Sequence, residues 1–202
     1  MVTRAAAPSP QRTARRLAWV TIAWNVAEAV IALAAGAAAS SIALVGFGLD
    51  SSVEVLSAIV IVWQLHGAPE QRERVTLKLI AASFFALGAY VAVQSVATLA
   101  THSEPASSPV GIAVAVASLV VMPILARSKR RNGNAMGSVT VVADSNQTRL
   151  CAYLSAILLG GLVLNSAVGW WWADPLAAID IAVLAVAEGR QAWRGETCDD
   201  CC

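Results

Sequence analysis

Six long stretches with few or no charged side chains constrain the fold of this chain more than any other feature. They cover residues 17–38, 41–65, 76–100, 109–126, 139–165 and 173–189. The hydrocarbon core of a bilayer is about 30 Å thick, and a helix needs roughly 20 apolar residues to cross it. The sequence therefore predicts an all-α membrane protein with six transmembrane helices. Because 57% of the 202 residues are hydrophobic and 13% are charged, soluble enzymes and nucleic-acid-binding proteins are excluded.

Basic residues predict how these helices are oriented. Every second connector contains no lysine or arginine. These connectors are residues 36–40, 101–108 and 166–172. All basic residues except Arg149 lie in the other connectors or near the two termini. They are Arg4, Arg12, Arg15, Arg16, Arg72, Arg74, Lys78, Arg127, Lys129, Arg130, Arg131, Arg190 and Arg194. The positive-inside rule then places both termini in the cytoplasm. The chain divides into a basic N-terminal arm, a transmembrane domain and a tail, at residues 1–16, 17–190 and 191–202.

Acidic residues in the middle of the second stretch predict a cation site. Asp50 and Glu54 are four residues apart, so their side chains share one face of a helix. Gln147 and Cys151 repeat this spacing in the fifth stretch and supply an amide oxygen and a thiol. A carboxylate at the bilayer centre costs about 2.5 to 3.5 kcal/mol, so it requires a proton, a partner or a cation. If the two helices face each other, the four side chains give the ligand number of a tetrahedral divalent-metal site.

Each of these residues also has a structural interpretation. The two carboxyl groups can instead share a proton or bond to Asn25 and Gln94. Gln147 can join two helices by a hydrogen bond, and Cys151 can be a small core residue. In the metal interpretation, four further side chains surround the ligands or form a proton path. They are Asn25, Glu28, Asp144 and Asp180.

Three segments resemble one known family, the cation diffusion facilitators, which are six-helix exporters of divalent metals. SSIALVGFGLDSSVEVLSA is similar to their second helix, in which an Asp is followed four residues later by Asp or Glu, here Asp50 and Glu54. VVADSNQTRLCAYLSA is similar to the start of their fifth helix, and WWWADPLAAIDIA to the start of their sixth. In the fifth helix, family members place a His or Asp and then an Asp where this chain has Gln147 and Cys151. The resemblance implies a metal site between the second and fifth helices.

The end of the chain differs from most members of that family. They carry a cytoplasmic metal-sensing domain after the sixth helix, whereas this chain ends within about a dozen residues, so it resembles the short branch that lacks the domain. Its tail reads GETCDDCC and combines three thiols with two carboxylates, which suit the capture of a zinc-like ion. The candidate ligands of the tail are Cys198, Asp199, Asp200, Cys201 and Cys202. The alternative is an unstructured end that binds nothing.

These observations predict a divalent metal efflux transporter in a plasma membrane of bacterial type, exchanging metal for protons. Zn²⁺ is the expected cargo, with Cd²⁺, Co²⁺, Mn²⁺ and copper as alternatives, and no prosthetic group is expected. The resemblance implies a homodimer, which would pair through small-residue faces around Gly88 or around Gly160 and Gly161. Enzymatic activity is not expected, since the chain has neither a His-Glu-x-x-His nor a Gly-x-Ser-x-Gly motif. A non-transporting membrane adaptor and a passive cation channel are the competing functions.

Overall fold

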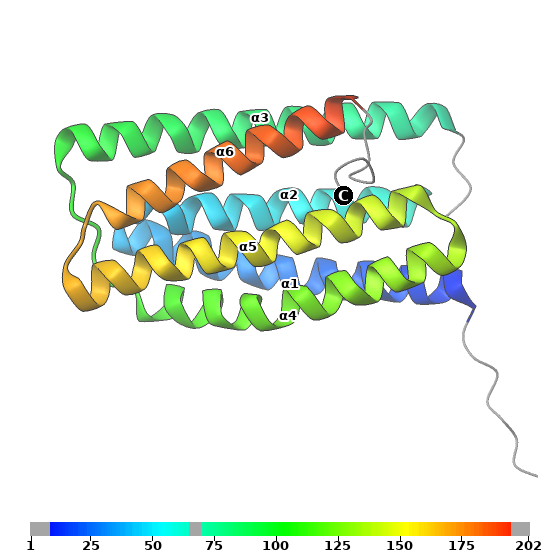
Figure 1. The fold of residues 1–202 in the computed structure, drawn as a ribbon, viewed down its shortest axis with the longest axis horizontal. Coiled ribbons are helices and arrows are strands. Elements are labelled where there is room, and N and C mark those ends of the chain that lie inside the picture. The colour runs from blue at the N-terminus through cyan, green and yellow to red at the C-terminus, as the bar shows by residue number, and fades with distance from the viewer. Residues whose placement is uncertain (1–8, 65–69, 195–202) are drawn as a thin grey trace, which may run out of the picture.

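The computed structural model describes residues 9–64 and 70–194, and these residues form six helices that run alternately up and down (Figure 1). The helices are α1 (Pro10–Ala39), α2 (Ile42–Gln64), α3 (Glu70–Thr101), α4 (Pro109–Met136), α5 (Val139–Val168) and α6 (Ala173–Arg194). The predicted all-α fold is confirmed. The first helix begins, and the last helix ends, at the same end of the bundle. That this end faces the cytoplasm stays a prediction.

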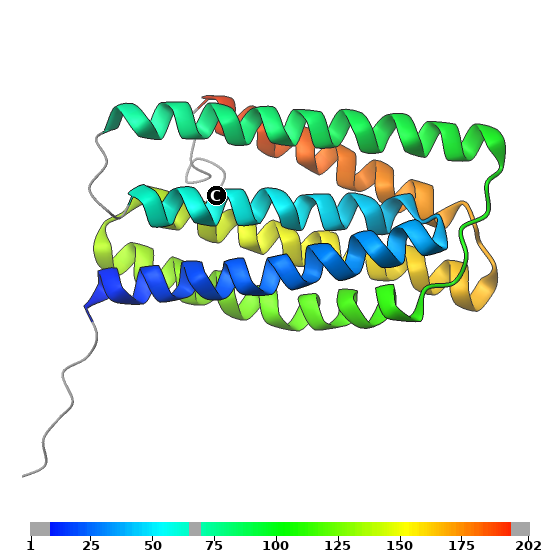
Figure 2. The same ribbon diagram turned by 180° about the vertical axis from the view of Figure 1, so that it is seen from behind.

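The helices pack in three close pairs, α1 with α2, α3 with α6 and α4 with α5. α2 and α5 lie in the middle of the bundle, between the layer of α3 and α6 and the layer of α1 and α4 (Figure 2). Their fully buried side chains include Leu44 and Phe47 of α2 and Leu158 of α5. Large apolar side chains cover the outside, which is the pattern of a surface that faces lipid rather than water. Polar side chains on the inner faces of α2 and α5 are therefore shielded from both phases.

Five of the six helices within the described residues are long and apolar enough to cross a membrane. They are α1 to α5, with the apolar parts of α2, α3 and α5 at Ile42–Trp63, Ala81–Thr101 and Asp144–Val168. α6 has 22 residues but contains Asp174, Asp180, Glu188 and Arg190, which lower its hydropathy. Five spans are thus supported by length and composition, and the sixth stays a prediction.

Two helices extend well beyond the apolar stretches that predict them. α1 begins at Pro10, so part of the expected N-terminal arm is helical, and α4 continues to Met136 rather than ending near residue 126. Hydropathy marks only the part of a helix that is apolar, whereas backbone geometry marks where it ends. At the end of α4, Gly137 adopts a left-handed φ of 61° that L side chains avoid. Ser138 then starts α5 by accepting a hydrogen bond from the backbone N–H of Val141 at 3.4 Å.

The first turn of α2 is fixed by a side chain from α6. Asp174 is fully buried and accepts hydrogen bonds from the Ser41 hydroxyl and from the backbone N–H groups of Ile42 and Ala43, the latter two at 3.0 and 3.3 Å. These N–H groups lie at a helix start, where they have no partner within the helix. A carboxylate there also interacts favourably with the helix dipole. Asp174 thus ties the beginning of α2 to the beginning of α6.

Two glycines that the sequence suggests for a dimer interface contact α6 of the same chain instead. A Cβ atom added to Gly88 of α3 would lie 2.8 Å from Cγ2 of Val186, and one added to Gly161 of α5 would lie 2.9 Å from Cβ of Ala177. Such distances leave no room for a methyl group. The small residues at these positions let α6 approach its neighbours within the chain. Gly160 has open space around its Cα, so only this glycine of the three faces outward.

Gly161→Ala is expected to destabilise the protein by about 1 to 3 kcal/mol, because the added methyl group must push α5 away from α6. The backbone of α6 adds to the strain, since the Ala173 carbonyl oxygen would lie 3.2 Å from the added Cβ atom. Gly160→Ala is the matched control, and it should be neutral or raise stability by about 0.5 to 1 kcal/mol. Thermal unfolding in detergent measures both. Equal melting temperatures for the two variants would contradict the close approach of α5 and α6.

Candidate cation site

The structure brings together three of the four predicted ligands. Asp50 and Glu54 lie on the inner face of α2 and are 6% and 1% exposed, and Cys151 lies on the facing side of α5 and is 1% exposed. The Cys151 thiol contributes to the electrostatic environment of both carboxyl groups, so the three side chains are neighbours in the interior of the bundle. Oxygen and sulfur donors of this kind suit a borderline divalent ion such as Zn²⁺.

Gln147, the fourth predicted ligand, lies one turn before Cys151 on α5 and is half-buried. Its Nε2 atom is buried and has no hydrogen-bond partner among the described residues. Nothing in the described part of the chain therefore holds this amide as a bridge between helices. Its position fits the edge of the site more closely than its centre.

Each oxygen of Glu54 has a different environment. The Thr148 hydroxyl donates a hydrogen bond to Oε1 at 2.6 Å, and the same oxygen lies 3.8 Å from Nζ of Lys129. Oε2 is buried but accepts no hydrogen bond from an N–H or O–H group of the described residues. A buried carboxylate oxygen without such a donor is rare, because its desolvation is then uncompensated. One oxygen of Glu54 is thus held by Thr148 and Lys129, and the other has no such partner in the described structure.

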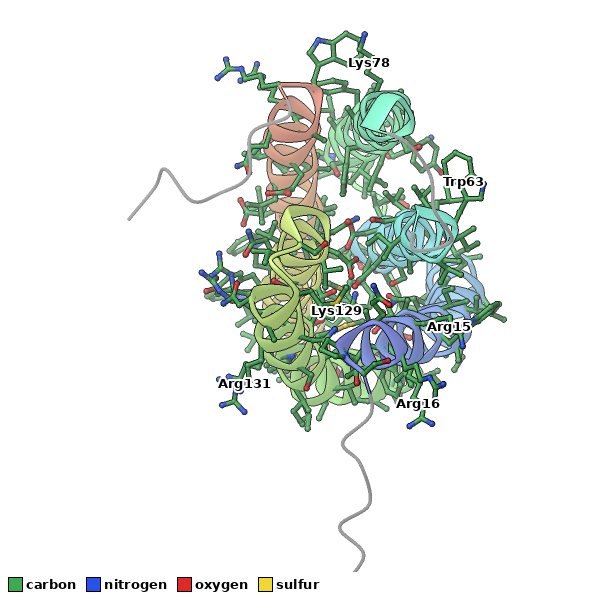
Figure 3. All side chains as sticks on the ribbon, turned by 90° about the vertical axis from the view of Figure 1, so that its right-hand side faces the viewer. Arg15, Arg16, Trp63, Lys78, Lys129 and Arg131 are labelled. Carbon is green, nitrogen blue, oxygen red and sulfur yellow. The ribbon has the colours of Figure 1, made fainter. Side chains whose placement is uncertain are left out.

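Lys129 is the residue that the sequence interpretation placed wrongly. The sequence predicts it in a cytoplasmic connector, but α4 continues past it, and its side chain is 2% exposed (Figure 3). Nζ lies 2.8 Å from Oδ2 of Asp144 and donates a hydrogen bond to Thr148 Oγ1 at 2.7 Å. Figure 3 shows Lys129 between the helices, whereas Arg15, Arg16 and Arg131 point outward at the same end. Lys129 therefore belongs to the interior of the bundle.

A signal for this position is present in the sequence. Lys129 is in helical register with three other buried residues of α4. They are Met122, Ala126 and Gly133. Spacings of four, three and four residues place all four on one helix face. Hydropathy alone misses this face because it counts lysine as a surface residue wherever it occurs.

The four residues that the sequence predicts around the ligands lie in three separate parts of the structure. Asp144 pairs with Lys129, as described above. Glu28 of α1 accepts a hydrogen bond from the Ser51 hydroxyl at 2.8 Å, and Asn25 lies one turn before it, donating to the Thr21 carbonyl oxygen at 3.0 Å. Both are buried, and the Glu28 carboxylate is close enough to interact with the charge of Asp50. Asp180 is on the exposed face of α6 and is not brought to the cluster. Its predicted role in a proton path has no support from this position.

The polar side chains of the candidate cation site contact one another in this structure. No group of three or more His, Cys, Asp or Glu side chains within residues 9–64 and 70–194 is arranged to hold a metal ion directly. Ion binding therefore requires side-chain movement in this cluster, although Thr148 and Lys129 occupy only the Oε1 side of Glu54. The predicted capture residues of the tail, Cys198 to Cys202, lie outside the described residues. The cluster between α2, α4 and α5 is therefore the site that the described structure offers.

Comparison with known proteins supports a transporter. An uncharacterized transporter of Synechocystis sp. is 26% identical over 194 residues, which cover 91% of this chain and 63% of the relative. The cation-efflux pump FieF of Shewanella oneidensis is 35% identical over 95 residues, or 47% of this chain and 31% of the relative. The chain thus spans less than two thirds of the length of either relative. No protein-family model matches it. With five helices able to span a bilayer, these similarities identify an integral multi-pass membrane protein.

Proposed function

We propose that this protein is an efflux transporter for a divalent metal cation, with Zn²⁺ as the main cargo. The observation that carries the proposal is the convergence of Asp50 and Glu54 of α2 with Cys151 of α5 in the bundle interior. Carboxylates at this depth are costly unless they serve an ion or a proton. Similarity to a cation-efflux pump supports the same class of cargo. A thiol in place of a third carboxylate favours Zn²⁺ or Cd²⁺ over Mn²⁺.

The transport cycle we propose follows from the position of the cluster. A metal ion enters from the cytoplasm, binds between α2 and α5, and leaves on the other side when the helices rock about the site. Because metal ligands must be deprotonated, binding releases protons and unloading allows reprotonation. Metal would thus move in exchange for protons across a plasma membrane of bacterial type. A homodimer remains part of this proposal, with contacts on outward faces such as that of Gly160 rather than Gly88 or Gly161.

Flux measurements in proteoliposomes test the proposal. Vesicles that contain the protein and an internal Zn²⁺ indicator should take up the metal faster than protein-free vesicles, and an outward proton gradient should accelerate uptake further. A passive channel would respond to the zinc gradient without depending on the proton gradient. A membrane adaptor would give the flux of empty vesicles with Zn²⁺, Cd²⁺, Co²⁺ and Mn²⁺ alike. The first result would favour a passive channel and the second a membrane adaptor, and either would contradict metal–proton exchange.

A further inference from the structure

We propose that Lys129 is a built-in positive charge that weakens the hold of the cation site on its cargo. The inference rests on the proposed function and assigns a role to a residue outside the ligand set. Lys129 comes from α4, whereas the ligands come from α2 and α5. Its role is to set how strongly the site holds its cargo rather than to bind the cargo.

Carboxylates and a hydroxyl group surround Lys129 inside the bundle. Its side chain is 2% exposed, and a buried ammonium group is unfavourable unless carboxylates and hydrogen-bond acceptors surround it. Asp144 lies 2.8 Å from Nζ, Thr148 Oγ1 lies 2.7 Å away, and Glu54 Oε1 lies 3.8 Å away. All three partners face the candidate site. Lys129 therefore acts on the same cluster of charges as the cargo.

Lys129 offsets one of the negative charges around the site. Asp50, Glu54 and Asp144, together with the nearby Glu28, contribute up to four negative charges when ionised, and a metal-bound Cys151 thiolate would add a fifth, whereas Lys129 contributes one positive charge. Without the lysine, the same groups would retain a larger surplus of negative charge beside the bound ion. A surplus charge in a low-dielectric interior would hold a cation too strongly for rapid release.

Glu54 shows how an ion and the lysine can act on one carboxylate. Oε1 faces Thr148 and Lys129, whereas Oε2 accepts no hydrogen bond from an N–H or O–H donor in the described structure. A cargo ion can use Oε2 while Oε1 keeps its protein partners. The positive charge of Lys129 then offsets part of the negative charge of the Glu54 carboxylate and leaves Oε2 free to bind the ion. This arrangement weakens binding by a fixed amount and leaves the coordination open.

A series of charge variants tests the proposal on metal-stripped, full-length protein in detergent. Thermal-shift titrations with Zn²⁺, repeated with Cd²⁺, give the half-saturating metal concentration of each variant. Lys129→Gln makes the cluster more negative and should lower that concentration on the order of tenfold. Asp144→Asn makes it less negative and should raise the concentration by a similar factor. The double variant restores the net charge of the parent and should bind metal as the parent does.

Arg130→Gln is the matched control, since it removes a positive charge from the neighbouring exposed position of α4 and should not alter metal binding. If melting temperatures change across the series while half-saturating concentrations do not follow the net charge, Lys129 only joins helices and the proposal is wrong. If Lys129→Gln does not fold, the decision rests on whether Asp144→Asn raises the half-saturating concentration and the double variant returns it to the parent value. Failure of the parent to respond to any divalent cation would instead refute the proposed function itself.

Discussion

Asp50→Asn is expected to reduce metal flux through reconstituted protein at least about 100-fold. Loss of residues that merely orient metal ligands costs 10- to 100-fold in many sites, so loss of a charged ligand should cost more. Asparagine keeps the size of the side chain and one oxygen but removes the charge that attracts a divalent ion. Uptake of Zn²⁺ into proteoliposomes measures the effect. Flux equal to that of the parent would contradict the assignment of the site.

The loss of flux should occur in a protein that is still folded. Asp50 lies near the negative charges of Glu54 and Glu28, so its neutralisation relieves repulsion instead of breaking an ion pair. Thermal stability in detergent should therefore be unchanged or higher. Asp180→Asn is the matched control, because it makes the same chemical change on the exposed face of α6 and should leave flux within about twofold of the parent. Equal losses in both variants would indicate a general effect of removing charge.

The sequence predicts the helices of this bundle better than it predicts the partners of their polar side chains. Apolar stretches of about 20 residues leave few alternatives to long helices, and the structure has a helix at each of the six, five of them able to span a membrane. The spacing of Asp50 and Glu54 likewise places both on one face, whatever that face contacts. Which helix lies opposite is decided by packing, and packing depends on side-chain shapes such as those at Gly161 and Ala177.

Lys129 shows where this reasoning fails. Charged residues near the end of a membrane helix are usually in water, and the positive-inside rule treats them as such. The helix here continues beyond the apolar stretch, so Lys129 lies on its inner face rather than in a loop. Burial of that lysine is favourable because Asp144 and Thr148 of the next helix, with Glu54 of α2, surround its ammonium group. A partner contributed by another helix is a property of the fold that no single segment reveals.

Asp174→Ala is expected to have the largest effect on stability, about 3 kcal/mol. The buried carboxylate accepts hydrogen bonds from Ser41, Ile42 and Ala43, and its removal leaves these donors without a partner at the start of α2. For a chain of this size, the melting temperature should fall by roughly 6 to 12 °C. The melting temperature of Asp174→Asn should lie between those of the parent and of Asp174→Ala, since the asparagine carbonyl oxygen can still accept a hydrogen bond.

The same variant connects stability with transport. Asp50 lies about two turns below the first residue of α2, so a helix released from α6 at its start can shift the carboxylates that face Cys151. We therefore expect Asp174→Ala to raise the half-saturating Zn²⁺ concentration as well as to lower the melting temperature. Asp180→Ala, on the exposed face of the same helix, should change neither. If Asp174→Ala unfolds at the temperature of the parent, then this carboxylate does not hold the start of α2, because losing three hydrogen bonds to a buried acceptor should lower the melting temperature.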